Sequence, residues 1–459
     1  GRHVSAQFDG TVTGGGAPPT LRIDYYVGAT LADGSPVLDP ATGAFRVMRD
    51  QAQLSGTWTP SDARDPVTLV ALDPAGPEDV ITAKSIAVQK YVSVVDAAEP
   101  GGHLQWRLEG QVSNYFEVDQ LLLTDRLGDG QHFDGGFQPI LTVRENGVAV
   151  YSGAMTQYTV ARDAVTGVST LRFDVSAELR AHGLDDALQG GGAGNPNPAT
   201  AVVSFRSVVE RAWTGPVSAD GLVDQGDLLD NSVVFSGQVA VTDRPIADGS
   251  MAAVTLPVST VEKSIYAING VISPASTQIV AGDEITFRLK LDLPLTSAHQ
   301  VRLTDFLPLP VLLAGDADAN STTAASFAFV NSVSGTPPAV GIASFGPTDS
   351  FHNSGDRSVA PTVTWNTAGN SLLFDFGDVD AGTYDASSID LLFTVRVVDA
   401  PFGDGLLLTN QVTSTETNSA GAVSEDNAII QFTLTEPALS ISKSVIATSN
   451  AQAVIADAD

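Results

Sequence analysis

The chain has no cysteine among its 459 residues. This absence excludes disulfide bonds, thiol nucleophiles and thiolate metal sites, so any mechanical strength must have another source. No run of about 18 or more apolar residues occurs, and we therefore expect no membrane-spanning helix. The stretch Gly1 to Ser5 lacks the apolar core of a signal peptide, so we expect a mature or internal start and infer localisation from architecture.

Basic residues are scarce: 23 Lys and Arg stand against 53 Asp and Glu, which gives a net charge of −30. Such a chain repels phosphate backbones and anionic lipid, which argues against nucleic acid as a partner. Cations are the natural counter-charge, and calcium is the cation that carboxylate loops bind best. An acidic coat that keeps the protein soluble explains the charge equally well.

Enzyme signatures are also missing. The six histidines are scattered without metal-binding spacing, and neither a Gly-x-Ser-x-Gly elbow nor a phosphate-binding glycine loop is present. Asp and Glu are so abundant that their number alone does not exclude the pair of carboxylates that a glycosidase needs. Aromatic residues, which line most active-site clefts, make up only 7%. We therefore expect a protein that is not an enzyme and has no cofactor, with calcium as the one open possibility.

What the chain does contain is period-two alternation of apolar and polar residues. In the segment 282–291, Ile285, Phe287, Leu289 and Leu291 share one face, which is typical of a half-buried strand. Similar patterns occur at 391–398 and 428–434, and Gly, Pro, Asn and Asp separate them at short intervals. One short helix is expected near 179–188. With 43% hydrophobic residues, this pattern predicts an all-β chain of tandem immunoglobulin-like sandwiches in an elongated array.

Three motifs occur twice in the same order, at nearly one offset. The offsets are 181 (287 − 106), 180 (305 − 125) and 179 (410 − 231). The paired segments are 104–108 with 285–289, 123–127 with 303–307, and 228–233 with 407–412. Two homologous modules therefore follow one another. The segment 437–445 repeats the pattern of 257–265 and indicates the beginning of a third copy.

The repeats define the expected domains. Residues 1–82 form a different β-rich domain, 83–256 the first immunoglobulin-like repeat, and 257–437 the second. Residues 438–459 are either the first strand of an incomplete third repeat or a strand donated to a neighbouring subunit; the interrupted repeat is the favoured interpretation. The Gly- and Asn-rich stretch 190–198 is expected to be an insertion loop in the first repeat.

The second module resembles the isopeptide-forming domains of fimbrial shafts and the related conserved-repeat modules of large bacterial surface proteins. The resemblance covers roughly residues 83–459 and rests on four features. These are an alternating strand that ends in Lys263, a strand that begins with Gly282-Asp283 and carries Phe287, the segment Thr304-Asp305-Phe306-Leu307-Pro308, and Asn410. It implies extracellular sandwiches that serve as stalks, fibres, adhesin arms or surface-layer units.

The resemblance also implies a Lys–Asn isopeptide bond, with Lys263 as nucleophile, Asn410 as electrophile and Asp305 as catalytic acid. The first module departs from the pattern, because its segment 125–128 lacks the proline. Its equivalent residues are Asn231 and Asp125, with Lys84 by offset or Lys90 by strand alternation as the lysine. The alternative is that these lysines lie at strand edges and that the Asp and Asn residues occupy turns.

Calcium is the second hypothesis for a site. Asp316, Asp318 and Asn320 have the alternate spacing of a calcium loop, but the sixth position is Ser321 instead of Gly, and the distant Glu is missing. Asp457 and Asp459 resemble the beginning of an aspartate-rich linker loop. A solvated loop is the favoured interpretation of the first set.

These observations predict a structural component of a bacterial cell-surface assembly, such as a surface layer, a fimbria or filament, or a stalk. Its partners would be further copies of the chain or neighbouring surface-protein subunits. The alternative is a receptor-binding adhesin whose binding site lies in residues 1–82.

Overall fold

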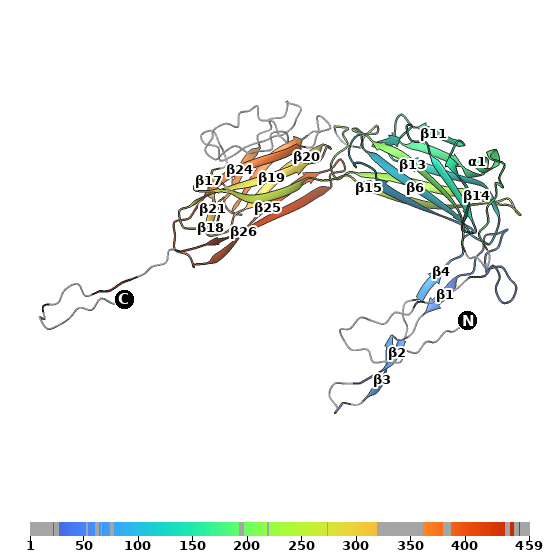
Figure 1. Ribbon diagram of the computed structural model, residues 1–459, viewed down its shortest axis with the longest axis horizontal. Coiled ribbons are helices and arrows are strands. Elements are labelled where there is room, and N and C mark those ends of the chain that lie inside the picture. The colour runs from blue at the N-terminus through green and yellow to red at the C-terminus, as the bar shows by residue number, and fades with distance from the viewer. Residues whose placement is uncertain are drawn as a thin grey trace.

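The computed structural model describes residues 22, 27–51, 54–59, 64–65, 67–73, 78–191, 197–217, 220–272, 274–318, 361–379, 387–436, 441–444 and 449. Two β-sandwiches follow one another end to end, and smaller β-hairpin-like units precede them (Figure 1). The fold is the all-β array of immunoglobulin-like sandwiches that the alternation predicts. Among the described residues, no helix is long and apolar enough to cross a membrane.

The first sandwich contains two antiparallel sheets. One has the strand order β10 (Val148–Ala154), β9 (Ile140–Glu145), β13 (Ala199–Val209), β6 (His103–Val112) and β5 (Ile86–Val94), with β8 (Gln131–Phe133) also paired to β13. The other has the order β11 (Tyr158–Arg162), β12 (Ser169–Asp174), β7 (Val118–Leu127), β14 (Leu228–Val239) and β15 (Arg244–Thr255).

The second sandwich also contains two sheets, which are antiparallel except for the pairing of β18 with β26. One sheet has the order β17 (Val271–Ile272), β16 (Thr260–Ile268), β19 (Glu284–Leu293), β24 (Ser387–Val397) and β21 (Leu312–Asp318). The other has the order β18 (Gln278–Ile279), β26 (Val423–Leu434), β25 (Leu406–Thr417), β20 (Ala298–Phe306), β23 (Ser371–Val379) and β22 (Thr362–Asn366).

The two sandwiches share one topology. The run β13-β6-β5 of the first corresponds to β24-β19-β16 of the second, and β11-β12-β7-β14-β15 corresponds to β22-β23-β20-β25-β26. These eight strands of each sandwich repeat in the order that the sequence offsets predict. The three repeated motifs consequently occupy equivalent positions in the two sandwiches.

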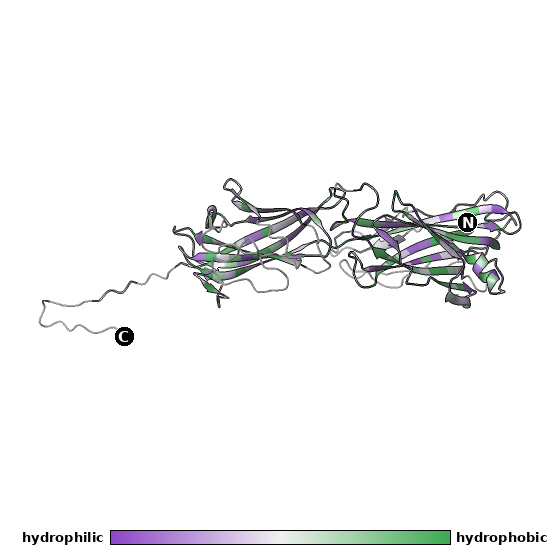
Figure 2. Cartoon of the chain, turned by 90° about the horizontal axis from the view of Figure 1, so that it is seen from above, coloured by the Kyte–Doolittle hydropathy of each residue, from purple (hydrophilic) through white to green (hydrophobic). Residues whose placement is uncertain are grey.

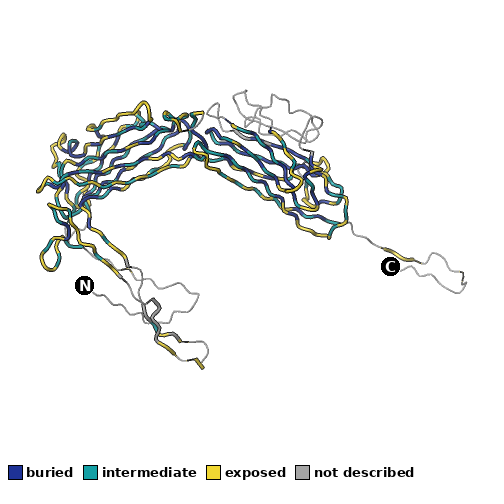
Figure 3. Tube along the Cα trace, turned by 180° about the vertical axis from the view of Figure 1, so that it is seen from behind, coloured by how far each residue is buried: buried dark blue, intermediate teal, exposed yellow. Residues whose placement is uncertain are grey.

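Each sandwich encloses its own hydrophobic core between its sheets, as the dark interior strands of Figure 3 show. Hydrophobic and hydrophilic residues alternate along the strands, because successive side chains point to opposite faces (Figure 2). The largest fully buried side chains are aromatic: Trp106, Phe173, Phe205 and Phe235 in the first core, and Phe287, Phe374, Phe393 and Phe432 in the second.

The open edge of each sandwich is closed by side chains. In the first, Asp248 of β15 accepts a hydrogen bond from the backbone N–H of Val88 at 3.0 Å, which ties β5 to the opposite sheet. In the second, Asp426 of β26 accepts one from the backbone N–H of Val261 at 2.8 Å. These contacts hold the first strand of each module close to its last strands.

The N-terminal region contains two two-stranded sheets, β1 (Met48–Gln51) with β4 (Glu78–Ile81), and β2 (Leu54–Trp58) with β3 (Thr68–Asp73). Its core is small and consists of Val37, Leu38 and Ala83. This region joins the first sandwich where Arg244 Nε donates to the carbonyl oxygen of Pro40 at 2.7 Å.

Several local predictions need correction or stay open. The short helix exists, but α1 spans Val175–Ala181 instead of 179–188, because Asp174 caps its N-terminus and Gly183 has a positive φ just beyond its end. Most of the predicted insertion loop 190–198 lies outside the described residues. Of the predicted strand in 438–459, only 441–444 and 449 are described, and 441–444 form no strand; Ile441 is 97% exposed.

Candidate functional site

Lys263 lies inside the second sandwich. Alternation along β16 directs its side chain toward the core, and that side chain is completely buried. Its ammonium group forms an ion pair with Asp305, whose side chain is equally buried. The amine also lies 4.8 Å from the ring centre of Phe287 and 5.5 Å from that of Phe393. The alternative of a lysine at a solvated strand edge is therefore wrong.

Asp305 and Asn410 come from neighbouring strands of the opposite sheet. In the register of β20 and β25, Asp305 faces Val412, so Asn410 is its diagonal neighbour on the same face. Both are fully buried. The sequence alternative placed them in turns, and this too is wrong. Lys263, Asp305 and Asn410 with the two phenylalanines are called the second cluster below.

The first sandwich contains the same set of groups. Lys90 of β5 forms a buried ion pair with Asp125 of β7, and its amine lies 5.0 Å from the ring centre of Trp106 and 5.8 Å from that of Phe205. We call Lys90, Asp125 and Asn231 with these two rings the first cluster.

The register of the first cluster matches as well. Asp125 faces Val233 of β14, which again makes Asn231 the diagonal neighbour, and Asn231 is fully buried. The sequence did not decide whether Lys84 or Lys90 is the lysine of the first cluster. Lys84 is 58% exposed and pairs with Asp248 instead. Strand alternation identified the buried lysine, and the sequence offset did not.

Burial has the same effect on pKa in both clusters: it lowers the pKa of the lysine and raises that of the aspartate. It lowers the pKa of Lys90 to about 8 although the charge of Asp125 acts to raise it, and it raises the pKa of Asp125 to about 6 against the effect of Lys90. In the second cluster, burial likewise lowers the pKa of Lys263 and raises that of Asp305. Both shifts favour a neutral amine beside a protonated carboxyl.

The asparagines are poorly satisfied in their buried positions. Asn410 lies close enough to Asp305 to act on its pKa, yet neither of its amide atoms makes a hydrogen bond of ordinary geometry. The same holds for Asn231 beside Asp125. Among the described residues ten buried side-chain polar atoms lack a partner, and six of them belong to these four residues. Because unpaired buried polar groups each cost about 1–3 kcal/mol, this concentration calls for a chemical reason.

The calcium hypothesis has no further support from the described residues. Asp316 and Asp318 belong to strand β21, so the expected loop is wrong at these two positions. Asn320, Asp457 and Asp459 lie outside the described residues. Calcium binding at these positions stays a prediction.

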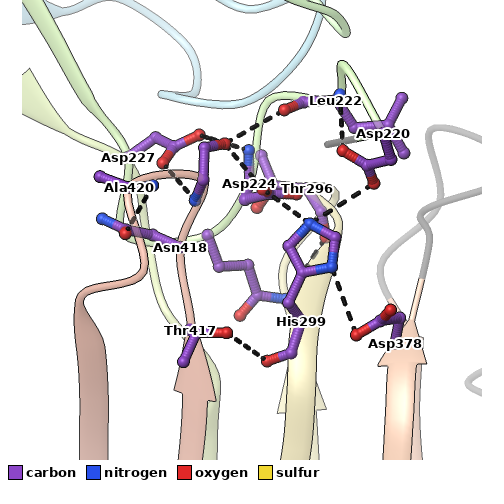
Figure 4. Close-up of polar contacts among 12 residues, drawn as sticks. Asp220, Leu222, Asp224, Asp227, Thr296, His299, Asp378, Thr417, Asn418 and Ala420 are labelled. Atoms are coloured by element: carbon purple, nitrogen blue, oxygen red, sulfur yellow. Dashed lines mark hydrogen bonds and ion pairs between the residues drawn. The ribbon is translucent and has the colours of Figure 1, made fainter. Parts of the chain in front are cut away.

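A second constellation, which sequence reasoning missed, lies between the two sandwiches. Asp220, Asp224 and His299 bring one imidazole nitrogen and two carboxylates within 4.8 Å of one another (Figure 4). His299 was one of the scattered histidines, and it is 75 positions from Asp224 (299 − 224). No local spacing could have revealed this contact, because it depends on how the two sandwiches meet.

No protein-family model matches the chain, and no curated protein matches it in sequence. Its fold is similar to solved structures at low identity. The C-terminal domain of the Streptococcus agalactiae antigen I/II polypeptide BspA is 10% identical with a TM-score of 0.27, covering 76% of this chain and 100% of that one. BcpA, the major pilin subunit of Bacillus cereus, is 10% identical with a TM-score of 0.25, covering 89% of each chain.

A shorter likeness is to the collagen-binding subdomain of the Enterococcus faecalis surface protein ACE. It is 12% identical with a TM-score of 0.19, and covers 36% of this chain and 92% of that one. Identities and TM-scores this low carry no information about the ligands or assembly of the present chain. Its own buried clusters are therefore the basis for assigning a function.

Proposed function

We propose that this chain is a structural stalk segment of a bacterial cell-surface assembly, outside the cell, in which each sandwich is cross-linked by a Lys–Asn isopeptide bond. The observation that carries the proposal is the recurrence of one buried Lys–Asp–Asn set, with its two aromatic rings, at equivalent positions of two sandwiches. A chance burial of a lysine would not repeat its carboxylate, its amide and both rings.

The reaction needs only these side chains. The neutral amine of Lys263 attacks Cγ of Asn410 while the protonated carboxyl of Asp305 polarises the amide oxygen. The Cγ–N bond of the asparagine then breaks and Asp305 relays the amine proton to the leaving nitrogen. One amide bond forms, one ammonia leaves, and no oxidant or cofactor is consumed. The burial-driven pKa shifts favour the required protonation states.

The product also removes the unpaired groups. After reaction, the nitrogen of the new amide is the former lysine nitrogen, and the former Asn410 carbonyl can accept a hydrogen bond from protonated Asp305. Two buried amide atoms that lack partners are thereby replaced by a bonded group. Lys90, Asp125 and Asn231 would undergo the same change.

The bond would join the two sheets near both ends of each module. Lys263 is on β16, the first strand of its module, and Asn410 is on β25, the strand before the last. Force applied along the chain would then pass from β16 to β25 through the cross-link, so the residues between them would bear no tension. The bond thus supplies mechanical strength to a chain that has no disulfides.

Single-molecule extension of the full chain tests this role. The cross-links would enclose 147 residues (410 − 263) in the second module and 141 (231 − 90) in the first. At roughly 3.5 Å per extended residue, each enclosed segment would withhold about 500 Å of contour length. Lys263→Met should release this length from the second module only. Full release from the unmodified chain would contradict the proposal.

The partners of such a segment would be further copies of the chain or neighbouring surface subunits. The alternative of a receptor-binding adhesin with its site in residues 1–82 stays a prediction; no feature of the described part of that region favours it.

A further inference from the structure

The two sandwiches meet in a polar junction. The segment 220–227 of the first module contacts two loops of the second, those before β20 and between β25 and β26. The backbone N–H of Gln225 donates to the carbonyl oxygen of Ser297 at 2.8 Å, and Asn418 Nδ2 donates to that of Gly226 at 3.0 Å. Ser419 Oγ lies 2.7 Å from Asp224 Oδ2. The junction is therefore built from specific contacts.

Within this junction, three side chains direct ligand atoms at one point (Figure 4). His299 Nε2 lies 3.1 Å from Asp224 Oδ2 and 3.4 Å from Asp220 Oδ2. Four ligands held about 2.0–2.1 Å from a tetrahedral cation stand about 3.3 Å apart, so this spacing suits a shared metal ion. An imidazole carries at most one hydrogen on Nε2, and one hydrogen cannot serve both carboxylates with good geometry.

Two further features point to a ligand. Asp224 is fully buried, and its Oδ1 atom has no hydrogen-bond partner. An unpaired, fully buried carboxylate oxygen is costly unless a cation compensates it. On the other side of the ring, His299 Nδ1 lies 3.3 Å from Asp378 Oδ1. Such a carboxylate fixes the tautomer that leaves Nε2 free to bind a metal, as is usual for metal-binding histidines.

We propose that His299, Asp224 and Asp220 bind one first-row divalent cation, in particular Zn²⁺, which locks the two sandwiches together. One imidazole with two carboxylates is a ligand set for zinc-like ions, whereas calcium takes only oxygen ligands and needs more of them. Two ligands come from the first module and one from the second, so the ion would fix the junction. The site is independent of the isopeptide bonds, since it shares no residue with either cluster.

Equilibrium dialysis of the full chain against Zn²⁺, followed by elemental analysis, tests the site. The buffer contains 0.15 M salt and excess Mg²⁺, roughly physiological screening that suppresses non-specific binding to the acidic surface. One Zn²⁺ per chain is expected. His299→Gln and Asp220→Asn should each weaken this binding at least tenfold. Asp220 is 32% exposed at its side chain, and Asn can still accept the hydrogen bond from the backbone N–H of Leu222, so Asp220→Asn should fold normally.

His103 provides a matched control. It also lies beside two carboxylates, Asp96 at 2.8 Å and Asp134 at 3.9 Å, but on the exposed surface of the first module. His103→Gln should leave the stoichiometry and affinity for Zn²⁺ unchanged. The proposal is overturned if the unmodified chain binds no more Zn²⁺ than His299→Gln does, or if His103→Gln reduces binding equally. In that case His299 serves only as an ion-paired residue of the junction.

Discussion

Replacing Asp305 by Asn tests the role of the carboxyl in the second cluster. The substitution keeps the size and polarity of the side chain but removes the group that relays protons between Lys263 and Asn410. We therefore expect Asp305→Asn to fold without forming the second isopeptide bond. The first cluster, which uses Asp125, should react as before.

The stability effect can be worked out from the length of the enclosed chain. A cross-link that closes 147 residues (410 − 263) reduces the entropy of the unfolded chain by the equivalent of about 5 kcal/mol, by the relation used for disulfides. For a domain of 150–250 residues, each kcal/mol corresponds to about 2–4 °C in the melting temperature. The second sandwich should then melt about 10–20 °C lower in Asp305→Asn.

Differential scanning calorimetry of the full chain, combined with intact mass, provides the assay. Asp125→Asn is the reciprocal variant and should lower only the transition of the first sandwich. Glu416→Gln is the matched control. Glu416 is a buried carboxylate of the second module that accepts a hydrogen bond from Ser259 Oγ and lies outside the cluster. If Asp305→Asn retained the full ammonia deficit and melted like the unmodified chain, the reasoning would be refuted.

Three further predictions follow from the same geometry. Lys90→Met should restore the mass of one ammonia whereas Lys84→Ala should not, because only Lys90 is buried beside Asp125; a deficit lost in Lys84→Ala would reverse the assignment. In Asn231→Ala, Lys90 and Asp125 stay unreacted, and burial raises the pKa of Asp125 from 3.8 to about 6. The folded state then binds a proton that the unfolded chain releases, so the urea midpoint should fall as the pH rises from 3.8 through 6. Adding Asp125→Asn to this variant should flatten the pH dependence, and a urea midpoint that rises with pH would contradict the prediction. Phe432→Ala should cost about 3–5 kcal/mol in urea unfolding, because the ring is buried against Phe287; Ile429→Ala, on the exposed face of the same strand, should change stability by only about 0.5 kcal/mol.

The second cluster was predicted because the family resemblance and the repeat offset agreed. The resemblance implied Lys263, Asp305 and Asn410, and the offset tied Asp305 and Asn410 to equivalents in the first module. Where strand alternation and the repeat offset disagreed, at Lys84 and Lys90, only the fold could decide. Burial of a lysine depends on which face of β5 the opposite sheet covers, and offset alone does not contain that information.

The junction could not be predicted, for a different reason. The contact between Asp224 and His299 depends on how the loops of two modules meet, and no periodicity within either module specifies it. Asp316 and Asp318 show the opposite error: their spacing matched a metal loop, but alternate residues also share one face of a strand, and they belong to β21. The helix begins earlier than the apolar pattern predicts, because Asp174 caps its N-terminus.

The most direct test of the cross-linked stalk is the intact mass of the purified, denatured chain, followed by mapping of the joined peptides. The account predicts a mass lower than that of the sequence by two ammonia molecules, with Lys90 joined to Asn231 and Lys263 joined to Asn410. A deficit of one would confine the bond to one module. An unmodified mass would contradict the account and leave two sandwiches with buried but unreacted clusters.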